Sequence, residues 1–581
     1  MSPREALKTY FGYDDFRPLQ SEIIASVLEG RDTLALMPTG GGKSICFQVP
    51  TLVMGHADPQ KRLCLVITPL IALMRDQVAN LQARGIHAAA VYTGMSWDKQ
   101  RVALDNCLYG PYHFLYCSPE RLESEEFRKR IADLPIGLIA VDEAHCISQW
   151  GYDFRPSYLN IAAIRELHPD VPVLALTATA TPETIEDIQD KLGFKTKNVL
   201  RKSFHRENLV YVVRRTDKKE EQIAHILSKV PGSAIVYVRN RKRAQELAEF
   251  LTTNDQRLTT NYYHAGLTTK ERNERQQAWT EGKTRVIVAT NAFGMGIDKP
   301  DVRVVIHYDL PSHLESYYQE AGRAGRDGKT AYAVLLYNEQ EDKAKLKKRA
   351  VDTYPPKEFV ESVYHKTMDF LQVGAGSGLG HRFTLHIDQL CQVMRLPVIQ
   401  TYSALHILTH AGYIDFEEEH ETQPRVQILV PRHQLGEYNL SYEQAELLDV
   451  LMRSYTGIYT DLQYVREADE VPTTNDKRQT TNHDILVSLA QRGIVTYIPR
   501  SVGCSLTMTT ERQTEIYLSP AIFEERQERF VNKLRAMLEY ADQTQFCREQ
   551  VLLDYFGEKN AVPCGHCDVC RELARIILRP M

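Results

Sequence analysis

The sequence lacks the features that mark exported and membrane-embedded proteins. It has no run of about 18 apolar residues, so we expect no membrane span. Residues 1–12 contain no apolar core flanked by basic residues and no cleavage site, so we expect no signal peptide. Without an export signal, the 11 cysteines indicate a reducing compartment, and we expect a cytoplasmic protein.

An excess of charge of one sign is also absent. Lysine and arginine number 70 against 75 acidic residues, which leaves a formal net charge of −5. This balance excludes a strongly basic architectural DNA-binding protein, but a DNA enzyme with local basic stripes remains compatible with it. The length of 581 residues exceeds what one hydrophobic core supports, so we expect three or four domains.

Short, almost wholly apolar runs alternate with helical patterns between residues 30 and 340. Such runs are typical of strands that are covered on both faces of a parallel sheet. They fall into two sets, which predict α/β domains at residues 1–204 and 205–340. The predicted strands are 33–36, 63–67, 138–141 and 173–176 in the first domain, and 234–238, 286–289, 304–306 and 331–334 in the second.

A different pattern fills residues 341–520. Segments 381–432 and 441–518 each read as two helices, a glycine and a short strand, which is the outline of a winged-helix module. We therefore expect a linker followed by two winged-helix-like modules. The alternative is a generic α+β insertion.

A glycine-rich segment, 37–44 (MPTGGGKS), follows a predicted strand and precedes an apolar helix. This is the context of a P-loop, in which backbone N–H groups and a helix N-terminus face phosphate oxygens. The predicted nucleotide-binding residues are Thr39, Gly40, Gly41, Gly42, Lys43 and Ser44. Lys43 is expected to reach the β and γ phosphates and Ser44 to bind Mg²⁺. The alternative is a glycine-rich turn without a ligand.

The tetrapeptide Asp142-Glu143-Ala144-His145 directly follows the predicted strand that ends at residue 141. A carboxylate at that end of a strand can hold Mg²⁺ beside a P-loop, and Asp142 suits this role. Glu143 suits orienting and deprotonating the attacking water. We include His145 in the same catalytic set.

Four of the cysteines cluster near the C-terminus. Cys564, Cys567 and Cys570 form two adjoining CxxC pairs, and Cys547 lies upstream. Four thiolates suffice for a tetrahedral Zn²⁺ site, and four protein ligands leave no open position, so the site is expected to be structural. One alternative is that these cysteines form disulfide bonds. Another is that His566 replaces one of the cysteines as a zinc ligand.

Several segments together resemble the RecQ family of superfamily-two helicases. The P-loop, the 142–145 box and Thr177-Ala178-Thr179 resemble superfamily-two motifs. The aromatic-rich loop 148–156 (SQWGYDFRP) narrows the resemblance to RecQ, and 290–299 (TNAFGMGIDK) and 319–328 (QEAGRAGRDG) resemble motifs five and six. The nucleotide-recognition motif of that family is matched by Leu7, Phe11, Gly12, Phe16, Arg17 and Gln20.

This resemblance implies an α/β fold class. It consists of two tandem RecA-like parallel-sheet domains, followed by winged-helix-like α+β segments and a helical zinc-binding module at 521–581. In the family the zinc module directly follows the second helicase domain, whereas here residues 341–520 intervene. We expect a short bacterial form without the further C-terminal helical domain, HRDC.

The resemblance also implies roles at the nucleotide. Phe16, Arg17 and Gln20 are expected to bind the adenine, since amide and guanidinium groups fit its donor–acceptor pattern. A surface ion pair is the alternative for Arg17. Arg326 is expected to be the arginine finger, with Arg323 nearby, because a planar fork suits a transferring phosphoryl group. An interdomain salt bridge is the alternative.

The aromatic-rich loop is the expected DNA contact. Trp150 and Phe154 are expected to stack on single-stranded bases, and Arg155 to meet phosphate. The alternative is that Trp150 fills a gap in the core. The family implies that this loop couples DNA binding to ATP hydrolysis.

The resemblance therefore predicts an ATP-dependent DNA helicase that unwinds duplex DNA 3′ to 5′ in repair, recombination or replication. Its cofactors are ATP, Mg²⁺ and Zn²⁺, its partners are single-stranded and duplex DNA, and its location is the bacterial nucleoid. The main alternative is a DNA-stimulated ATPase that remodels without strand separation. An RNA helicase or a non-catalytic scaffold is disfavoured by Lys43, Glu143 and Arg326 together with the aromatic loop and the zinc module.

Overall fold

The computed structural model describes residues 1–577 apart from short gaps. The residues not described are 39, 93–94, 96, 152–154, 256, 295–296, 298, 423, 456, 460–462, 466–481, 499–500 and 578–581. The chain forms two compact units, residues 1–346 with 531–581, and residues 347–530. Across the described residues, every helix is too short or too polar to span a bilayer.

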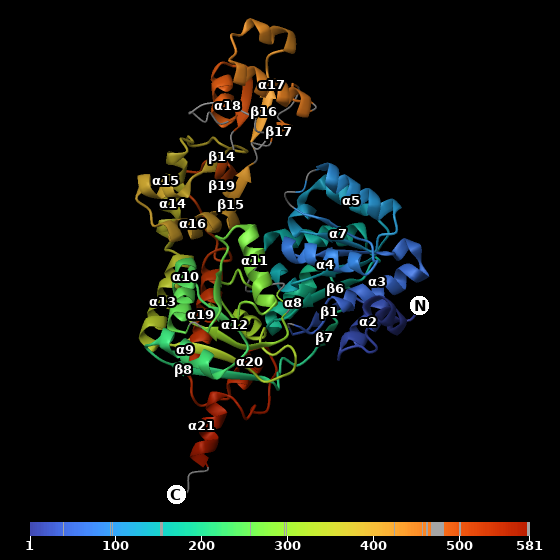
Figure 1. Ribbon diagram of the computed structural model, residues 1–581, viewed down its shortest axis with the longest axis vertical. Helices are drawn as coiled ribbons and strands as arrows, with labels where there is room; N and C mark the ends of the chain where they lie inside the picture. Colours follow the sequence, from blue (N-terminus) through green and yellow to red (C-terminus); the bar gives the residue numbers. More distant parts are fainter. Residues whose placement is uncertain are drawn as a thin grey trace. The chain divides into compact units, whose positions relative to one another are not determined.

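A seven-stranded sheet forms the core of the first domain, drawn from blue to teal in Figure 1. Its order is β3-β4-β2-β5-β6-β1-β7, and all pairs are parallel. The strands are β1 Thr33–Leu36, β2 Leu63–Ile67, β3 Ala88–Val91, β4 Phe114–Cys117, β5 Ile136–Val141, β6 Val173–Thr177 and β7 Val199–Arg201. The helices are α1 Pro3–Ala6, α2 Gln20–Leu28, α3 Ile45–Ala57, α4 Ile71–Ala83, α5 Trp97–Tyr109, α6 Glu125–Ala132, α7 Ile161–Leu167 and α8 Pro182–Lys191.

A six-stranded parallel sheet of order β10-β11-β9-β12-β13-β8 forms the core of the second domain. The strands are β8 Leu209–Arg215, β9 Ser233–Tyr237, β10 Thr260–Tyr263, β11 Val286–Ala289, β12 Val302–His307 and β13 Ala331–Tyr337. The helices are α9 Lys219–Lys229, α10 Arg241–Asn254, α11 Thr269–Thr280, α12 Leu314–Ala321 and α13 Glu339–Thr353.

The two parallel sheets confirm the predicted fold class, and all eight predicted strands are present. Strands β1, β2 and β5 are buried along their whole length, as their apolar composition requires in a sheet covered on both faces. Strands β3, β4, β7, β8 and β10 were not among the predicted strands. For β3 and β10 the reason is that alanine-rich and polar residues give no apolar run.

The unit 347–530 contains two three-stranded antiparallel sheets, one nested inside the other in sequence. The outer sheet has the order β14-β19-β15 and the inner one β17-β16-β18. The strands are β14 Arg382–Leu385, β15 Ile414–Thr422, β16 Arg425–Ile428, β17 Gln463–Tyr464, β18 Val495–Ile498 and β19 Ser501–Met508. The helices are α14 Lys357–Phe370, α15 Ile387–Met394, α16 Val398–His410, α17 Tyr442–Ser454 and α18 Asn482–Gln491.

The nesting differs from the two successive segments read from the sequence, 381–432 and 441–518. Strand β19 lies at the end of the second segment, yet it pairs with β14 and β15 of the first. Periodicity along the chain locates strands, but it does not identify their partners.

Three helices lie at the C-terminal end of the chain: α19 Glu524–Asp542, α20 Arg548–Tyr555 and α21 Asp568–Ile577. Their residues from 531 onward belong to the first unit. Helices α20 and α21 contact the edge strand β8 of the second domain, and α19 packs on α12 of the same domain. The ring of Tyr540 of α19 packs at a tilt against that of Tyr317 of α12, with ring centroids 5.2 Å apart. Phe556 packs on Phe204, which lies just before β8, with ring centroids 4.7 Å apart. These buried aromatic contacts attach the C-terminal module to the second domain.

Candidate nucleotide, DNA and metal sites

The P-loop runs from the end of β1 to the start of α3. Gly40 and Gly42 have φ of +81° and +80°, which favours glycine at both positions. A side chain at Gly41 would lie 2.9 Å from the main-chain oxygen of Pro38. The local backbone therefore requires the glycines, and the loop ends at the N-terminus of α3, which favours phosphate. Thr39 lies outside the described residues.

The acidic pair follows β5, and Lys43 faces it. Nζ of Lys43 lies 3.9 Å from Oε1 of Glu143. Burial raises the pKa of Asp142 to about 6, with a further contribution from the charge of Glu143, while Lys43 acts in the opposite direction. Two buried carboxylates beside one ammonium leave negative charge that a divalent cation can balance. The donor set therefore fits Mg²⁺, which prefers carboxylate and hydroxyl oxygens.

His145 links the acidic box to the end of β6. Its Nδ1 lies 2.9 Å from Oγ1 of Thr177 and 3.4 Å from the buried Oε2 of Glu143. Glu143 itself has φ of +48°, an uncommon conformation for a residue with a side chain. The structure thus brings Lys43, Asp142, Glu143 and His145 together at the carboxyl ends of neighbouring strands, where ligands bind in open α/β sheets.

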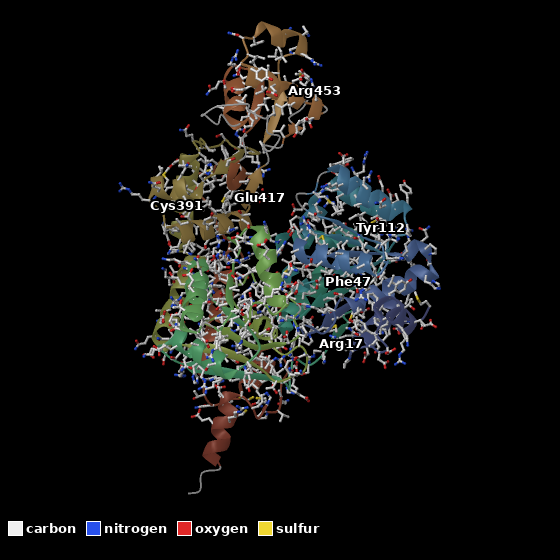
Figure 2. The ribbon with its side chains drawn as sticks, viewed as in Figure 1. Arg17, Phe47, Tyr112, Cys391, Glu417 and Arg453 are labelled. Carbon is white, nitrogen blue, oxygen red and sulfur yellow. The ribbon has the colours of Figure 1, made fainter. Side chains whose placement is uncertain are left out.

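The nucleotide-recognition residues contact the P-loop backbone in this structure. Arg17, labelled in Figure 2, donates from a terminal guanidinium nitrogen to the oxygen of Gly40 at 2.6 Å. Gln20 donates to the oxygen of Gly42 at 3.0 Å and accepts from the backbone N–H of Arg17 at 2.8 Å. Phe16 is half-buried against the domain core. These contacts leave the adenine role of Arg17 and Gln20 a prediction.

The two arginines of the second domain lie on the turn after α12. A guanidinium nitrogen of Arg326 donates to the oxygen of Ile297 at 2.6 Å, and buried Arg323 donates to the oxygen of Gly294. A Cβ built on Gly40 would lie 3.3 Å from Cδ of Arg326. Arg326 therefore lies directly beside the P-loop of the first domain, while Arg323 is held within the second.

The aromatic-rich loop is anchored through its backbone. Trp150 donates from its N–H to Oγ of Ser148 at 3.1 Å, and Lys533 of α19 donates to its main-chain oxygen at 2.7 Å. The Trp150 side chain is 40% exposed, which argues against a role as core filler. The backbone N–H of Arg155 donates to the oxygen of Cys146 at 2.8 Å. Phe154 lies outside the described residues.

The four C-terminal cysteines converge on one point. Sulfur atoms of Cys547, Cys564, Cys567 and Cys570 all lie within 4.8 Å of one another, and Cys567 and Cys547 are 3.9 Å apart. Tetrahedral Zn–S bonds of about 2.3 Å place sulfurs about 3.8 Å apart. Backbone N–H groups of Cys564, Cys567 and Cys570 donate to cluster sulfurs at 3.3–3.4 Å, which favours thiolates. The set fits Zn²⁺.

The remaining cysteines and His566 stand apart from this cluster. His566 Nε2 lies 3.3 Å from the main-chain oxygen of Leu209, so the ring contacts β8 as well as the neighbourhood of Cys564. The seven cysteines outside the cluster are all buried, as expected for core thiols: Cys46, Cys64, Cys107, Cys117, Cys146, Cys391 and Cys504.

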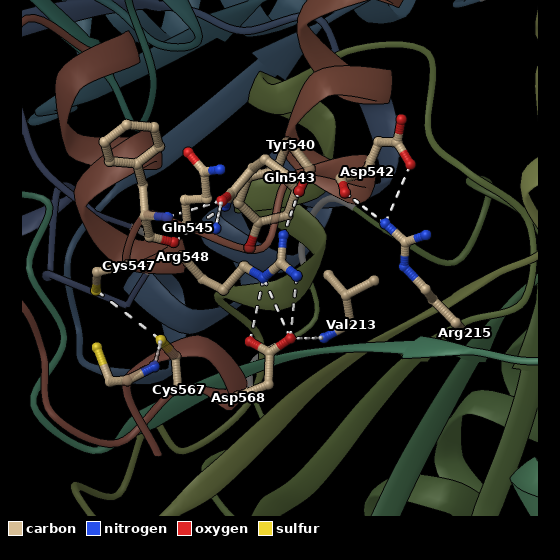
Figure 3. Close-up of polar contacts among 12 residues, drawn as sticks. Val213, Arg215, Tyr540, Asp542, Gln543, Gln545, Cys547, Arg548, Cys567 and Asp568 are labelled. Atoms are coloured by element: carbon tan, nitrogen blue, oxygen red, sulfur yellow. Dashed lines mark hydrogen bonds and ion pairs between the residues drawn. The ribbon is translucent and has the colours of Figure 1, made fainter. Parts of the chain in front are cut away.

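Arg548 fixes the cysteine cluster to β8, as Figure 3 shows. Its guanidinium bonds both carboxylate oxygens of Asp568 at 3.1 Å and donates to the oxygen of Tyr540. Asp568 also accepts from the backbone N–H of Val213 in β8 at 3.2 Å. No sequence motif predicts this link, because Val213 and Asp568 are 355 positions apart along the chain.

Comparison with known families assigns four segments of the chain. The family model for DEAD/DEAH box helicases matches residues 17–188, and the helicase conserved C-terminal domain matches 218–328. The RecQ zinc-binding model matches 510–571, and the RecQ helicase winged-helix domain of Bacteroidota matches 426–499. The last segment contains the inner sheet.

Curated relatives resemble a little over half of the chain. The ATP-dependent DNA helicase RecQ of Bacillus subtilis is 44% identical over 338 residues, 58% of this chain and 56% of that protein. RecQ of Haemophilus influenzae is 43% identical over 343 residues, which are 59% of this chain and 54% of that protein. The ATP-dependent helicase SGS1 of Saccharomyces cerevisiae is 39% identical over 342 residues, which are 57% of this chain and 23% of that protein. The chain spans about half the length of the bacterial relatives it matches.

Proposed function

We propose, on the premise that the chain belongs to the RecQ family of helicases, that it hydrolyses ATP to unwind duplex DNA, moving 3′ to 5′ along one strand. The observation that carries this proposal is the position of Arg326 beside Gly40, which joins the two domains at one nucleotide pocket. A pocket made from both halves closes on the triphosphate and opens after hydrolysis, and that cycle can drive movement along a strand.

The pocket contains each group that phosphoryl transfer requires. Lys43 neutralises the β and γ phosphates, and Glu143 orients and deprotonates the attacking water. Ser44 and Asp142 would hold Mg²⁺, which would neutralise negative charge on the phosphates. Arg326 supplies a planar cation from the second domain for the charge that develops at the γ phosphate, with Arg323 holding the adjacent backbone. Arg17 and Gln20 exchange their P-loop contacts for the adenine, and Phe16 packs beside it.

DNA reaches this pocket through the aromatic-rich loop. Exposed Trp150, with Phe154, stacks on bases of single-stranded DNA, and Arg155 contacts a phosphate. The loop begins three residues after His145, so a change in its conformation has a short route to Glu143. The zinc site is structural, because its four sulfur ligands complete a tetrahedron. We place the activity in DNA repair, recombination or replication at the bacterial nucleoid.

The test is ATP turnover measured with single-stranded DNA, a 3′-tailed duplex, a 5′-tailed duplex and single-stranded RNA of the same sequence. We expect DNA to stimulate turnover and the 3′-tailed duplex to be separated. Stimulation by DNA without strand separation would support the alternative, a translocase that remodels DNA. Stimulation by RNA alone, or turnover indifferent to nucleic acid, would refute the proposal.

A further inference from the structure

The segment that joins the two parallel sheets is held by the zinc module. It runs from residue 202 to 208, between β7 of the first sheet and β8 of the second. Glu558 accepts from the backbone N–H of Phe204 at 2.6 Å and from Oγ of Ser203 at 2.7 Å. Glu549 accepts from the backbone N–H of Arg206 at 2.9 Å and lies 3.0 Å from Nδ1 of His205. Two carboxylates of one module therefore fix the linker backbone at Phe204 and at Arg206.

Glu549 is unusual because it is a carboxylate buried against the linker. It is 2% exposed and lies on the first turn of α20, two residues after the zinc ligand Cys547. A buried carboxylate is unfavourable unless it is paired or hydrogen-bonded. Here its Oε1 takes both of the linker donors, so the geometry of the linker at Arg206 is set directly by the start of the zinc module.

The side chain of Arg206 then contacts the turn that carries the two arginines of the nucleotide pocket. Its guanidinium donates to the oxygens of Ala324 at 3.0 Å and Gly325 at 3.1 Å, and it reaches the oxygen of Gly322 at 3.5 Å. These three carbonyls bracket Arg323 and directly precede Arg326.

Asn208 holds the same turn from the linker side. Its amide donates to the oxygen of Gly325 at 2.7 Å and to that of Lys329 at 2.9 Å. Gly325 has φ of +64°, and a Cβ there would lie 2.5 Å from the Asn208 amide nitrogen. The turn and the linker thus approach each other so closely at position 325 that only glycine fits there without a clash.

We propose that Arg206 is a positioning residue for ATP hydrolysis, and that Glu549 of the zinc module sets Arg206, so that the module fixes the arginine-bearing turn at the nucleotide pocket. This inference rests on the proposed ATPase function. The series is continuous: Glu549 accepts from the Arg206 backbone, the Arg206 side chain holds the 322–325 turn, and Arg326 lies beside Gly40. The zinc module thereby acts on the chemistry without touching nucleotide.

The test compares Arg206→Ala and Arg206→Lys in the full chain. Arg206→Ala should lower kcat for DNA-stimulated ATP hydrolysis by about 10- to 100-fold, since a shift of about 1 Å at a catalytic group costs up to about 100-fold. KM for ATP should stay within about twofold, because the P-loop is untouched. Arg206→Lys should be intermediate, since an ammonium cannot span carbonyls as the guanidinium fork does.

Arg285→Ala is the matched control. Arg285 also donates to three main-chain oxygens within the second domain, those of Leu227, Val230 and Gly232, and neither it nor they touch the 322–325 turn. A merely structural role for Arg206 would lower the unfolding temperature of both variants and leave kcat per folded molecule unchanged in both. We expect kcat to fall in Arg206→Ala alone.

Glu549→Ala and Glu549→Gln extend the test to the zinc module, with zinc per chain measured in each. Glutamine keeps an oxygen that accepts from the Arg206 backbone, so Glu549→Gln should retain kcat while Glu549→Ala loses it with zinc still bound. Wild-type kcat in Arg206→Ala would overturn the inference. Absence of ATP turnover in the wild-type chain would instead overturn the proposed function, and the inference would fall with it.

Discussion

Lys533 donates a hydrogen bond to the main-chain oxygen of Trp150 at 2.7 Å, although 383 positions separate the two residues. The same ammonium lies 3.1 Å from Oε1 of buried Glu315 in α12. Burial raises the pKa of Glu315, but the charges of Lys533 and His313 together with hydrogen bonds outweigh burial, and the pKa is lowered. The backbone of the aromatic-rich loop is therefore fixed by a charged pair, while the indole remains exposed to a ligand.

Trp150→Ala should leave DNA-independent ATP turnover intact and remove its stimulation by single-stranded DNA. Loss of one stacked base should also weaken DNA binding by about 1–3 kcal/mol. Turnover and fluorescence anisotropy with an oligonucleotide measure both effects. Trp97→Ala is the control, since Trp97 is 52% exposed on α5 of the same domain and lies outside the loop. Retained stimulation in Trp150→Ala would show that the indole does not sense DNA.

Lys43→Ala should abolish ATP turnover, because the phosphates lose their cation and Glu143 loses its facing charge. Phosphate release measured with and without DNA is the readout. Lys8→Ala provides a control at an exposed lysine of the same domain, and it should behave as wild type. Turnover in Lys43→Ala would contradict the P-loop assignment.

Elemental analysis should find one zinc per chain, and Cys564→Ser should lose it. Binding of a structural zinc contributes on the order of 10 kcal/mol to the fold that it holds, so the variant should unfold its C-terminal helices first. Cys107→Ser also removes a buried thiol but lies outside the cluster, and it should keep its metal. A chain with no zinc, or a disulfide between these cysteines, would contradict the site.

The stability of the protein should fall with acid through His313. Burial lowers its pKa to about 4, below the usual value of about 6.5 for the unfolded chain. The unfolded state therefore takes up the proton first, and the free energy of unfolding decreases as pH falls from about 6.5 to 4, by at most about 1.4 kcal/mol per pH unit.

His313→Asn isolates this effect. His313 accepts from the backbone N–H of Ser316 at 3.1 Å as the N-cap of α12, and asparagine can keep that bond without titrating. The groups facing His313 are Glu315, Lys533, Glu320 and Arg239. Urea unfolding at pH 7 and pH 5 should show a smaller loss in the variant than in wild type. Equal losses would assign the acid sensitivity to other residues.

Much of the nucleotide pocket could be predicted from sequence because its groups sit in short local motifs. Gly40, Lys43 and Glu143 each follow a buried strand, and parallel strands bring their carboxyl ends to one edge. The cysteine cluster was predictable for the same reason, since CxxC spacing is a local signal. In each case a few consecutive residues contain both the chemistry and its placement.

The contacts that fix the second-domain turn could not be predicted in this way. Glu549 and Arg206 are 343 positions apart, and neither belongs to a repeated pattern. Their relationship depends on the return of the C-terminal helices to β8, which follows from tertiary packing. Lys533 is hidden from sequence reasoning for the same reason, because a lysine on a polar helix reads as solvated surface.

The pairing of Thr422 with Ser501 in the outer sheet has a consequence for how this protein can change. The chain leaves that sheet at the end of β15 and re-enters it at the start of β19, directly opposite. Residues 423–500 are therefore an insertion between two neighbouring strands. Excision of residues 423–500 and closure with a tight turn would leave the host strands in register. The inner module is therefore an insertion whose removal should preserve the strand pairing of the outer sheet.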